Sequence, residues 1–145
     1  MSTTITTMSE EGGALKQERP SVDQWLREAK ADPSAASCGM YLVHNGTVRC
    51  TARAKVRQGQ EDAAPVTGMS FHYDHEKAAR AVEAAKQMEG IGYVRVWLNE
   101  GELEVGDDIM LVLVGGDIRP HVIDALQTLV GTLKNECVSE RERTD

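Results

Sequence analysis

The sequence has no long apolar run. No stretch of its 145 residues approaches the roughly 18 consecutive apolar residues that a membrane-spanning helix needs, which excludes an integral membrane protein. Residues 1–13 also lack the cationic start and apolar stretch of a secretory signal, so we expect a cytoplasmic protein. Positive charge is in deficit as well, because 16 lysines and arginines stand against 23 acidic residues and give a formal net charge of −7. This balance argues against a general nucleic-acid-binding protein.

Cysteine is scarce and forms no motif. The three cysteines, Cys38, Cys50 and Cys137, are an odd number without a C-x-x-C pair, which disfavours both a disulfide framework and a closed zinc site. His72 and His75 would need one helix through both positions to share a metal ion, but His72 falls at the end of a predicted strand. The sequence also lacks a P-loop, a G-x-G-x-x-G motif and a nucleophile elbow. We therefore expect reduced thiols, no bound metal and no cofactor.

Length and composition fit one domain. Apolar residues make up 41% of the sequence and charged residues 27%, which is ordinary for a globular protein. Residues 1–19 are rich in Ser, Thr, Glu and Gly and predict a flexible tail, or one short edge strand around Thr4–Met8. We expect a single α+β domain over residues 20–141. A frayed tail follows at residues 142–145, within a charged end that starts at Glu140.

Hydrophobic periodicity places helices and strands within this domain. Ser21 can cap a short helix that the Asp32-Pro33 pair ends. Hairpin-length links between the later strands favour a mixed or antiparallel sheet with helices packed on it. The remaining predicted segments are a strand at 39–49, a loop at 50–65, a strand at 66–73, a helix at 75–89, strands at 93–98, 101–105 and 109–114, and a helix at 122–137.

Positive side chains gather in a few places in this acidic sequence. Arg49, Arg53, Lys55 and Arg57 follow the first strand of the domain with no acidic residue among them, and Arg119, Lys134, Arg141 and Arg143 lie at or beyond the last helix. If that helix packs on the sheet, some of these cations can line one pocket for a phosphate or a carboxylate, which guanidinium groups bind with paired donors. The alternative is a solvated basic loop. For Lys134, the alternative to a chemical role is a favourable interaction with the helix dipole.

Several segments of the sequence follow the motifs of one known family. Gly39–Arg49 (GMYLVHNGTVR) is similar to the pattern G-A-V-x-x-F-x-G-x-V-R, and Gly101–Ile109 is similar to a G-x-L-x-x-G-(D/E)-x-x segment. Glu76-Lys77-Ala78 resembles the start of the family's middle helix, Arg119 follows at the family spacing, and Leu133-Lys134 resembles an L-K motif. In these motifs the sequence resembles the MoaE family, the large catalytic subunits of molybdopterin synthase, from about residue 21 to residue 141.

This resemblance implies a fold, partners and a reaction. The fold is an α/β hammerhead-type α+β domain that forms a homodimer, and a heterotetramer with two small ubiquitin-like sulfur-carrier (MoaD-like) subunits. The reaction transfers sulfur from the thiocarboxylated C-terminus of the carrier to cyclic pyranopterin monophosphate in molybdenum cofactor biosynthesis. The resemblance implies that Lys134 is catalytic and that Arg49 and Arg119 bind the anionic substrate. We expect neither nucleic acid nor a membrane as a partner, and no bound metal or cofactor.

The sequence departs from the family pattern at three positions. Ile118 replaces a histidine before Arg119, His44 replaces an aromatic residue, and Arg141 falls where the family has a second lysine. We expect Arg141 to keep a substrate-binding charge, although arginine does not readily act as a nucleophile or proton donor. These departures leave a second hypothesis open, a non-catalytic MoaE-like paralogue that binds a carrier protein or a phosphorylated pterin.

Overall fold

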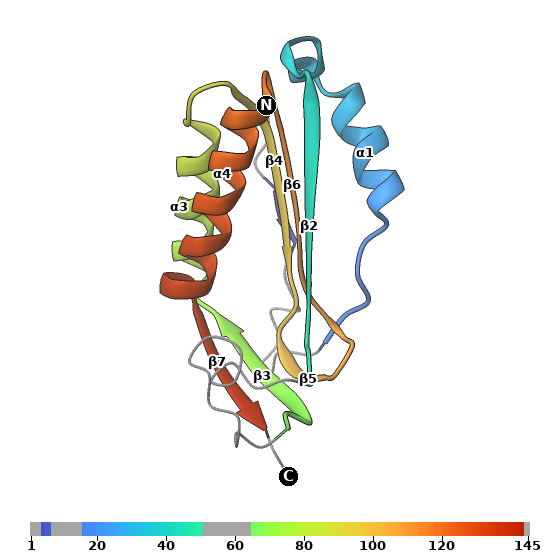
Figure 1. Cartoon of the computed structure of the whole chain (residues 1–145), viewed down its shortest axis with the longest axis vertical. Coiled ribbons are helices and arrows are strands. Elements are labelled where there is room, and N and C mark those ends of the chain that lie inside the picture. The colour runs from blue at the N-terminus through green and yellow to red at the C-terminus, as the bar shows by residue number, and fades with distance from the viewer. Residues whose placement is uncertain (1–3, 7–15, 51–64, 144–145) are drawn as a thin grey trace.

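The computed structural model describes residues 4–6, 16–50 and 65–143. Its larger sheet has the strand order β1 (Thr4–Thr6), β4 (Ile91–Leu98), β6 (Asp108–Gly116), β2 (Met40–Thr47), with β1 parallel to β4 and the other pairs antiparallel. A smaller antiparallel sheet has the order β5 (Gly101–Glu104), β3 (Gly68–Tyr73), β7 (Val138–Arg143). It sits at one end of the larger sheet (Figure 1).

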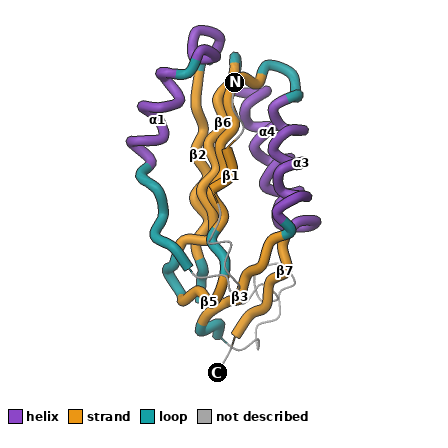
Figure 2. Tube along the Cα trace, turned by 180° about the vertical axis from the view of Figure 1, so that it is seen from behind, coloured by secondary structure: helices purple, strands orange, loops and turns teal. Residues whose placement is uncertain are grey.

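Helices cover both faces of the larger sheet. Helix α1 (Val22–Ala31) lies on one face, and α3 (His75–Lys86) and α4 (Arg119–Thr132) lie together on the other (Figures 1 and 2). A 3₁₀ turn, η1 (Pro33–Ser37), follows α1, and a π-helical turn, η2 (Leu133–Cys137), follows α4. The α+β prediction is confirmed. Across the residues that the structure describes, none of the helices has the length and apolar character to cross a bilayer.

Capping side chains start the first two helices where the sequence predicts them. The Ser21 hydroxyl accepts a hydrogen bond from the Gln24 backbone N–H at 3.2 Å, and the Asp74 carboxylate accepts one from the Lys77 backbone N–H at 3.0 Å. Helix α4 instead begins with the Arg119-Pro120 pair, and no side chain caps it. Its predicted extent to Cys137 is nearly right, but the last turn widens into η2.

The core lies on both sides of the larger sheet. Strand β6 is buried along almost its whole length, as expected for an apolar central strand. One core cluster fills the space between the sheet and α3 and α4, and a smaller one packs α1 against the sheet through Trp25 and Ala29. Alternate residues of β2 serve these two clusters: Met40 and Leu42 pack toward α4, whereas Tyr41 and Val43 pack toward α1.

Both predicted tails are partly wrong. Residues 138–143 form β7, which pairs with β3, so Glu140–Arg143 is a strand rather than a frayed end. At the other end, Thr4–Thr6 is the short edge strand that the sequence allowed. Gln17, placed in the predicted tail of residues 1–19, is bound through its backbone to the buried side-chain amide of Asn99. Its N–H donates to Asn99 Oδ1 at 2.8 Å, and its carbonyl accepts from Asn99 Nδ2 at 3.0 Å. The basic positions Arg53, Lys55 and Arg57 lie outside the described residues.

Candidate functional site

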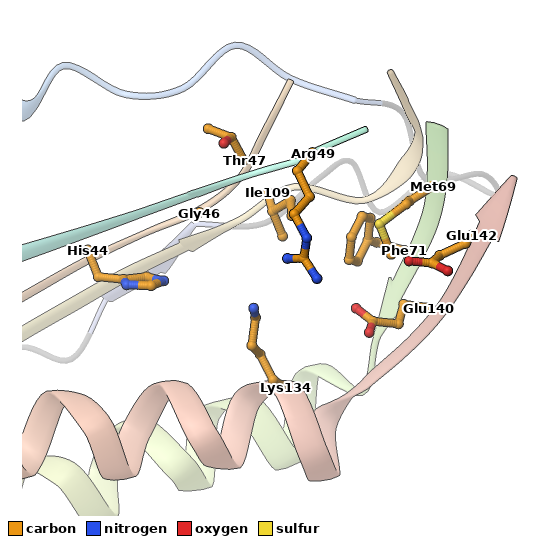
Figure 3. A pocket seen from close by; sticks show the side chains of 10 residues that line it. All are labelled: His44, Gly46, Thr47, Arg49, Met69, Phe71, Ile109, Lys134, Glu140 and Glu142. Atoms are coloured by element: carbon orange, nitrogen blue, oxygen red, sulfur yellow. The ribbon is translucent and has the colours of Figure 1, made fainter. Parts of the chain in front are cut away.

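A polar cavity lies where the two sheets and the end of the last helix meet. Its volume is about 220 Å³. Figure 3 shows the side chains that line it, drawn from β2 and the residues after it, from β3, from β6, from η2 and from β7. The lining residues are His44, Gly46, Thr47, Arg49, Met69, Phe71, Ile109, Lys134, Glu140 and Glu142.

Arg49 enters the cavity from a well-anchored piece of backbone. The preceding residue, Val48, is buried and exchanges two backbone hydrogen bonds with the turn before β6, donating to Asp107 at 2.9 Å and accepting from Gly106 at 2.8 Å. The Cys50 carbonyl accepts from the Val66 N–H at 2.8 Å. The arginine therefore projects from a backbone that is held on both sides.

Lys134 reaches the cavity from the opposite wall. It lies in η2, between Leu133, which has no exposed surface, and Cys137, which is 4% exposed. These two buried neighbours fix the turn, and π-helical turns of this kind occur often at functional sites. Figure 3 shows the lysine ammonium and the Arg49 guanidinium pointing toward each other across the cavity. Two positive charges aimed at one space favour an anion there.

His44 lies beside these two cations on β2, the open edge strand of the larger sheet. Burial and the nearby charge of Lys134 lower the pKa of this imidazole below its ordinary value, burial being the larger cause. The side chain is therefore neutral near pH 7. Its Nε2 atom is buried, and among the described residues it has no hydrogen-bond partner.

Two carboxylates complete the cavity, and the sequence analysis did not find them. Glu140 and Glu142 project into it from β7 (Figure 3). Successive strand residues face opposite ways, so Arg141, between them, points to the other face and is exposed. The predicted substrate-binding residue Arg141 therefore does not line this cavity. Glu140 and Glu142 are two residues apart, a spacing that places both side chains on one face of a strand. The spacing could have predicted their position only if residues 138–143 had been predicted to form a strand.

Arg119 is also separated from the cavity within one chain. It is the first residue of α4, whereas Lys134 lies two residues beyond Thr132, the last. At a rise of about 1.5 Å per residue, the helix places their Cα atoms roughly 20 Å apart. Within one chain, Arg49 and Lys134 converge on the cavity as predicted, whereas Arg119 does not.

A second hollow shares the same lysine with the cavity. It lies between β2 and the last turns of α4, has a volume of about 360 Å³, and is lined by His44, Leu126, Gln127, Val130, Gly131, Lys134 and Asn135. His44 and Lys134 line both spaces. We call the second space the α4 groove. Leu126, Val130 and Gly131 make it less polar than the cavity, and a Cβ atom on Gly131 would meet no atom within 4 Å.

Neither histidine of the possible metal pair has a metal-site environment. His72 is in β3, and His75 begins α3, where its Nε2 lies 2.7 Å from the buried Glu100 carboxylate. Among the described residues, no group of three or more histidine, cysteine or acidic side chains is arranged to hold a metal ion.

A family model described as "MoaE protein" matches residues 15–136. The chain belongs to the MoaE family. This confirms the resemblance identified from the sequence motifs. No curated protein matches the sequence.

Solved structures of MoaE-family proteins share the fold. The chain is similar to molybdopterin synthase from Staphylococcus aureus, with 15% identity, a TM-score of 0.67, and coverage of 97% of this chain and 90% of that chain. It is also similar to a MoaE protein from Burkholderia ambifaria, with 16% identity, a TM-score of 0.63, and coverage of 100% and 87%. A third match is a complex of subunits 1 and 2 of the molybdopterin-converting factor from Helicobacter pylori, with 17% identity, a TM-score of 0.59, and coverage of 97% and 83%. At these identities the matches establish the fold, and the hammerhead-type α+β prediction is confirmed.

Two departures of this MoaE chain from the family motifs have clear positions. Ile118 stands at the N-cap of α4, where its side chain is 52% exposed. His44 lies at the junction of the cavity and the α4 groove. One departure is therefore beside Arg119 and the other beside Lys134, at opposite ends of the helix.

Proposed function

We propose that this chain is the large subunit of a molybdopterin synthase and acts in molybdenum cofactor biosynthesis. It would transfer sulfur from the thiocarboxylated C-terminus of a small MoaD-like carrier to cyclic pyranopterin monophosphate. The observation that carries the proposal is the meeting of Arg49 and Lys134, from distant parts of a MoaE-family chain, in one cavity that shares Lys134 with a neighbouring groove. Both reactants are anions, so both require cations for binding and orientation.

The α4 groove has the character that an extended peptide tail requires. Its walls are partly apolar, and it leads to Lys134, so a tail lying in it would bring its terminal group to the lysine. The Helicobacter pylori structure is described as a complex of two subunits, which supports a carrier partner here. The carrier terminus would then stand between the groove and the cavity.

Lys134 and Arg49 would have different roles in the transfer. The thiocarboxylate sulfur would first bond to a carbonyl-level carbon of the pterin, whose carbon–oxygen bond breaks and releases the oxygen as water, which leaves a thioester between carrier and pterin. Water then attacks the thioester carbon, which places negative charge on the carbonyl oxygen, and the Lys134 ammonium is positioned to stabilise that charge. As the carbon–sulfur bond breaks, sulfur stays on the pterin and the carrier leaves as a carboxylate. Sulfur remains fully reduced, and the step needs no oxidant or reductant. The Arg49 guanidinium can hold the substrate phosphate with two parallel hydrogen bonds.

Arg119 can take part only if a second copy of the chain supplies it. The roughly 20 Å that α4 places between the Cα atoms of Arg119 and Lys134 keeps the two side chains from meeting at one reacting group in the same chain. Exposed apolar residues lie close to Arg119, namely Ile118 and Ile123 at 52% and 37% exposure. An apolar surface beside a functional residue supports a homodimer interface at this end of α4.

The proposal is tested by reconstituting the reaction. The purified chain is mixed with a thiocarboxylated carrier and cyclic pyranopterin monophosphate, and formation of the dithiolene product is followed. We expect product in proportion to the thiocarboxylate supplied, and none with a carrier that ends in an ordinary carboxylate. Absence of product while a competent large subunit succeeds in the same mixture would contradict the proposal.

One observation favours the non-catalytic alternative. Two acids line the cavity where anions must bind, and Arg141, which stands in place of the family's second lysine, points away from it. Under this alternative the chain binds the carrier or the pterin phosphate with ordinary affinity but forms no dithiolene. Calorimetric binding measurements beside the reconstitution separate the two functions.

A further inference from the structure

We propose that His44 is the third anion-contacting group of the cavity, and that it takes up a proton when a negatively charged ligand binds between Arg49 and Lys134. The inference rests on the proposed function only for the identity of the anion. That anion is either the carrier's terminal carboxylate group or the phosphate of the pterin. The shared chemistry is a compact oxyanion that keeps its charge between pH 5 and 8.

The position of His44 is the first support. It belongs to the β2 residues that face α4, together with Met40 and Leu42. It lines both the cavity and the α4 groove, as Lys134 does. Its Nε2 atom would lie 3.6 Å from a Cβ atom on Gly46, so the ring is folded over a residue that has no side chain. A ligand that contacts Lys134 from either space therefore occupies a space that this imidazole also lines.

The chemistry of the ring is the second support. A buried imidazole nitrogen normally has a hydrogen-bond partner, but Nε2 has none among the described residues. The neutral ring beside Lys134 is thus an unused polar group at the place where a ligand arrives. A bound anion would accept a hydrogen bond from this nitrogen once it is protonated, and a charged donor makes that bond stronger.

The surrounding charges explain why proton uptake accompanies anion binding. The charged groups that line the cavity with His44 are Arg49 after β2, Lys134 from η2, and Glu140 and Glu142 from β7. The α4 groove residues Leu126, Gln127, Val130 and Gly131 carry no charge. Before binding, the charge of Lys134 disfavours a protonated imidazole. An anion offsets the field of Lys134 and accepts a hydrogen bond from the protonated ring, and both effects raise the pKa of His44 although the ring stays buried. By linkage, the ligand then binds more tightly as the pH falls.

Two ligands identify the source of the anion. The first is an acetylated peptide that ends in Gly-Gly and has a free carboxylate with a pKa of about 3.5. The second is 3′,5′-cyclic GMP, a cyclic phosphodiester on a fused-ring base. Affinities are measured at pH 5.5 and 7.5 on the full chain, its His44→Gln variant and a His72→Gln control. His72 is a suitable control because it is exposed on β3 and faces away from Met69 and Phe71, which line the cavity.

For at least one ligand, we expect the wild-type protein and the His72→Gln variant to bind up to about tenfold more tightly at pH 5.5 than at pH 7.5. Tenfold is the factor expected if ligand binding raises the pKa of His44 by one unit. His44→Gln should remove this pH dependence. In NMR titrations of the four histidines, only the His44 midpoint should rise when the ligand is present.

Equal pH dependence in His44→Gln, an unchanged His44 midpoint, or no binding of either ligand would each overturn the inference. If the protein transfers sulfur but its affinity for both ligands does not depend on pH, the role of His44 is contradicted and the proposed function is not. If binding depends on pH as expected but no sulfur is transferred, only the proposed function is contradicted.

Discussion

Lys134→Ala is expected to lower the rate of sulfur transfer by about a hundredfold to a thousandfold, the loss that follows removal of a donor to a developing oxyanion. The lysine is the cation that lines both the cavity and the α4 groove, so its ammonium stands where the carrier terminus and the substrate would meet. Single-turnover measurements with thiocarboxylated carrier and cyclic pyranopterin monophosphate separate this loss in the chemical step from any loss in carrier binding.

The fold should not change in this variant. The η2 turn is held by the buried Leu133 and Cys137 on either side of the lysine. The free energy of unfolding should therefore change by no more than about 0.5 kcal/mol, as is usual for a substitution outside the core. Lys30→Ala is a matched control, because Lys30 is an exposed lysine in the last turn of α1. A Lys134→Ala protein that turns over at the wild-type rate would remove Lys134 from the mechanism.

A mixture of two inactive variants should regain activity. If a site combines Lys134 of one copy with Arg119 of another, Arg119→Ala and Lys134→Ala each damage every site in their own homodimers. Random exchange of equal amounts of the two variants makes half of the dimers mixed, and each mixed dimer has one intact site. The mixture should therefore recover about a quarter of the wild-type activity, provided that the chain forms a closed two-fold dimer.

This experiment tests whether Arg119 of one copy acts with Lys134 of another copy, or whether Arg119 lies outside the site. The subunits are exchanged by joint refolding, and mixed-dimer formation is verified by native mass spectrometry. A doubly substituted chain, Arg119→Ala with Lys134→Ala, mixed with either single variant is the control and should regain nothing. If mixed dimers form without recovered activity, or if Arg119→Ala alone is fully active, Arg119 does not belong to the site.

The sequence was informative where local pattern and final structure agree. Ser21 and Asp74 cap helices that the pattern predicted, and the apolar run at 109–114 became the buried central strand β6. Motif and charge together singled out Arg49 and Lys134, which the structure brings to one cavity. These features depend mainly on nearby residues or on a pattern that many related chains share.

The sequence was less informative where a contact distant along the chain decides the structure. Residues 138–143 read VSERER, which has no apolar alternation, and they become a strand because β3 offers a pairing edge. The errors at Arg141 and the failure to find Glu140 and Glu142 both follow from that missed strand. Gln17 is similar, because its place is fixed by the Asn99 amide from the end of β4 rather than by its own neighbours.

The most direct test locates the carrier terminus on this chain. A carrier prepared with a C-terminal thioester acylates an adjacent amine, and mass spectrometry identifies the lysine that is modified. The matched variants are Gly131→Phe, which fills the α4 groove, and Gly131→Ala, which adds one methyl group into open space. Both replacements favour a helix more than glycine does, so folding should be retained. We predict acylation mainly at Lys134, a yield at least several-fold lower in Gly131→Phe, and an unchanged yield in Gly131→Ala. Acylation spread over exposed lysines such as Lys30 and Lys77, with no dependence on Gly131, would contradict the account.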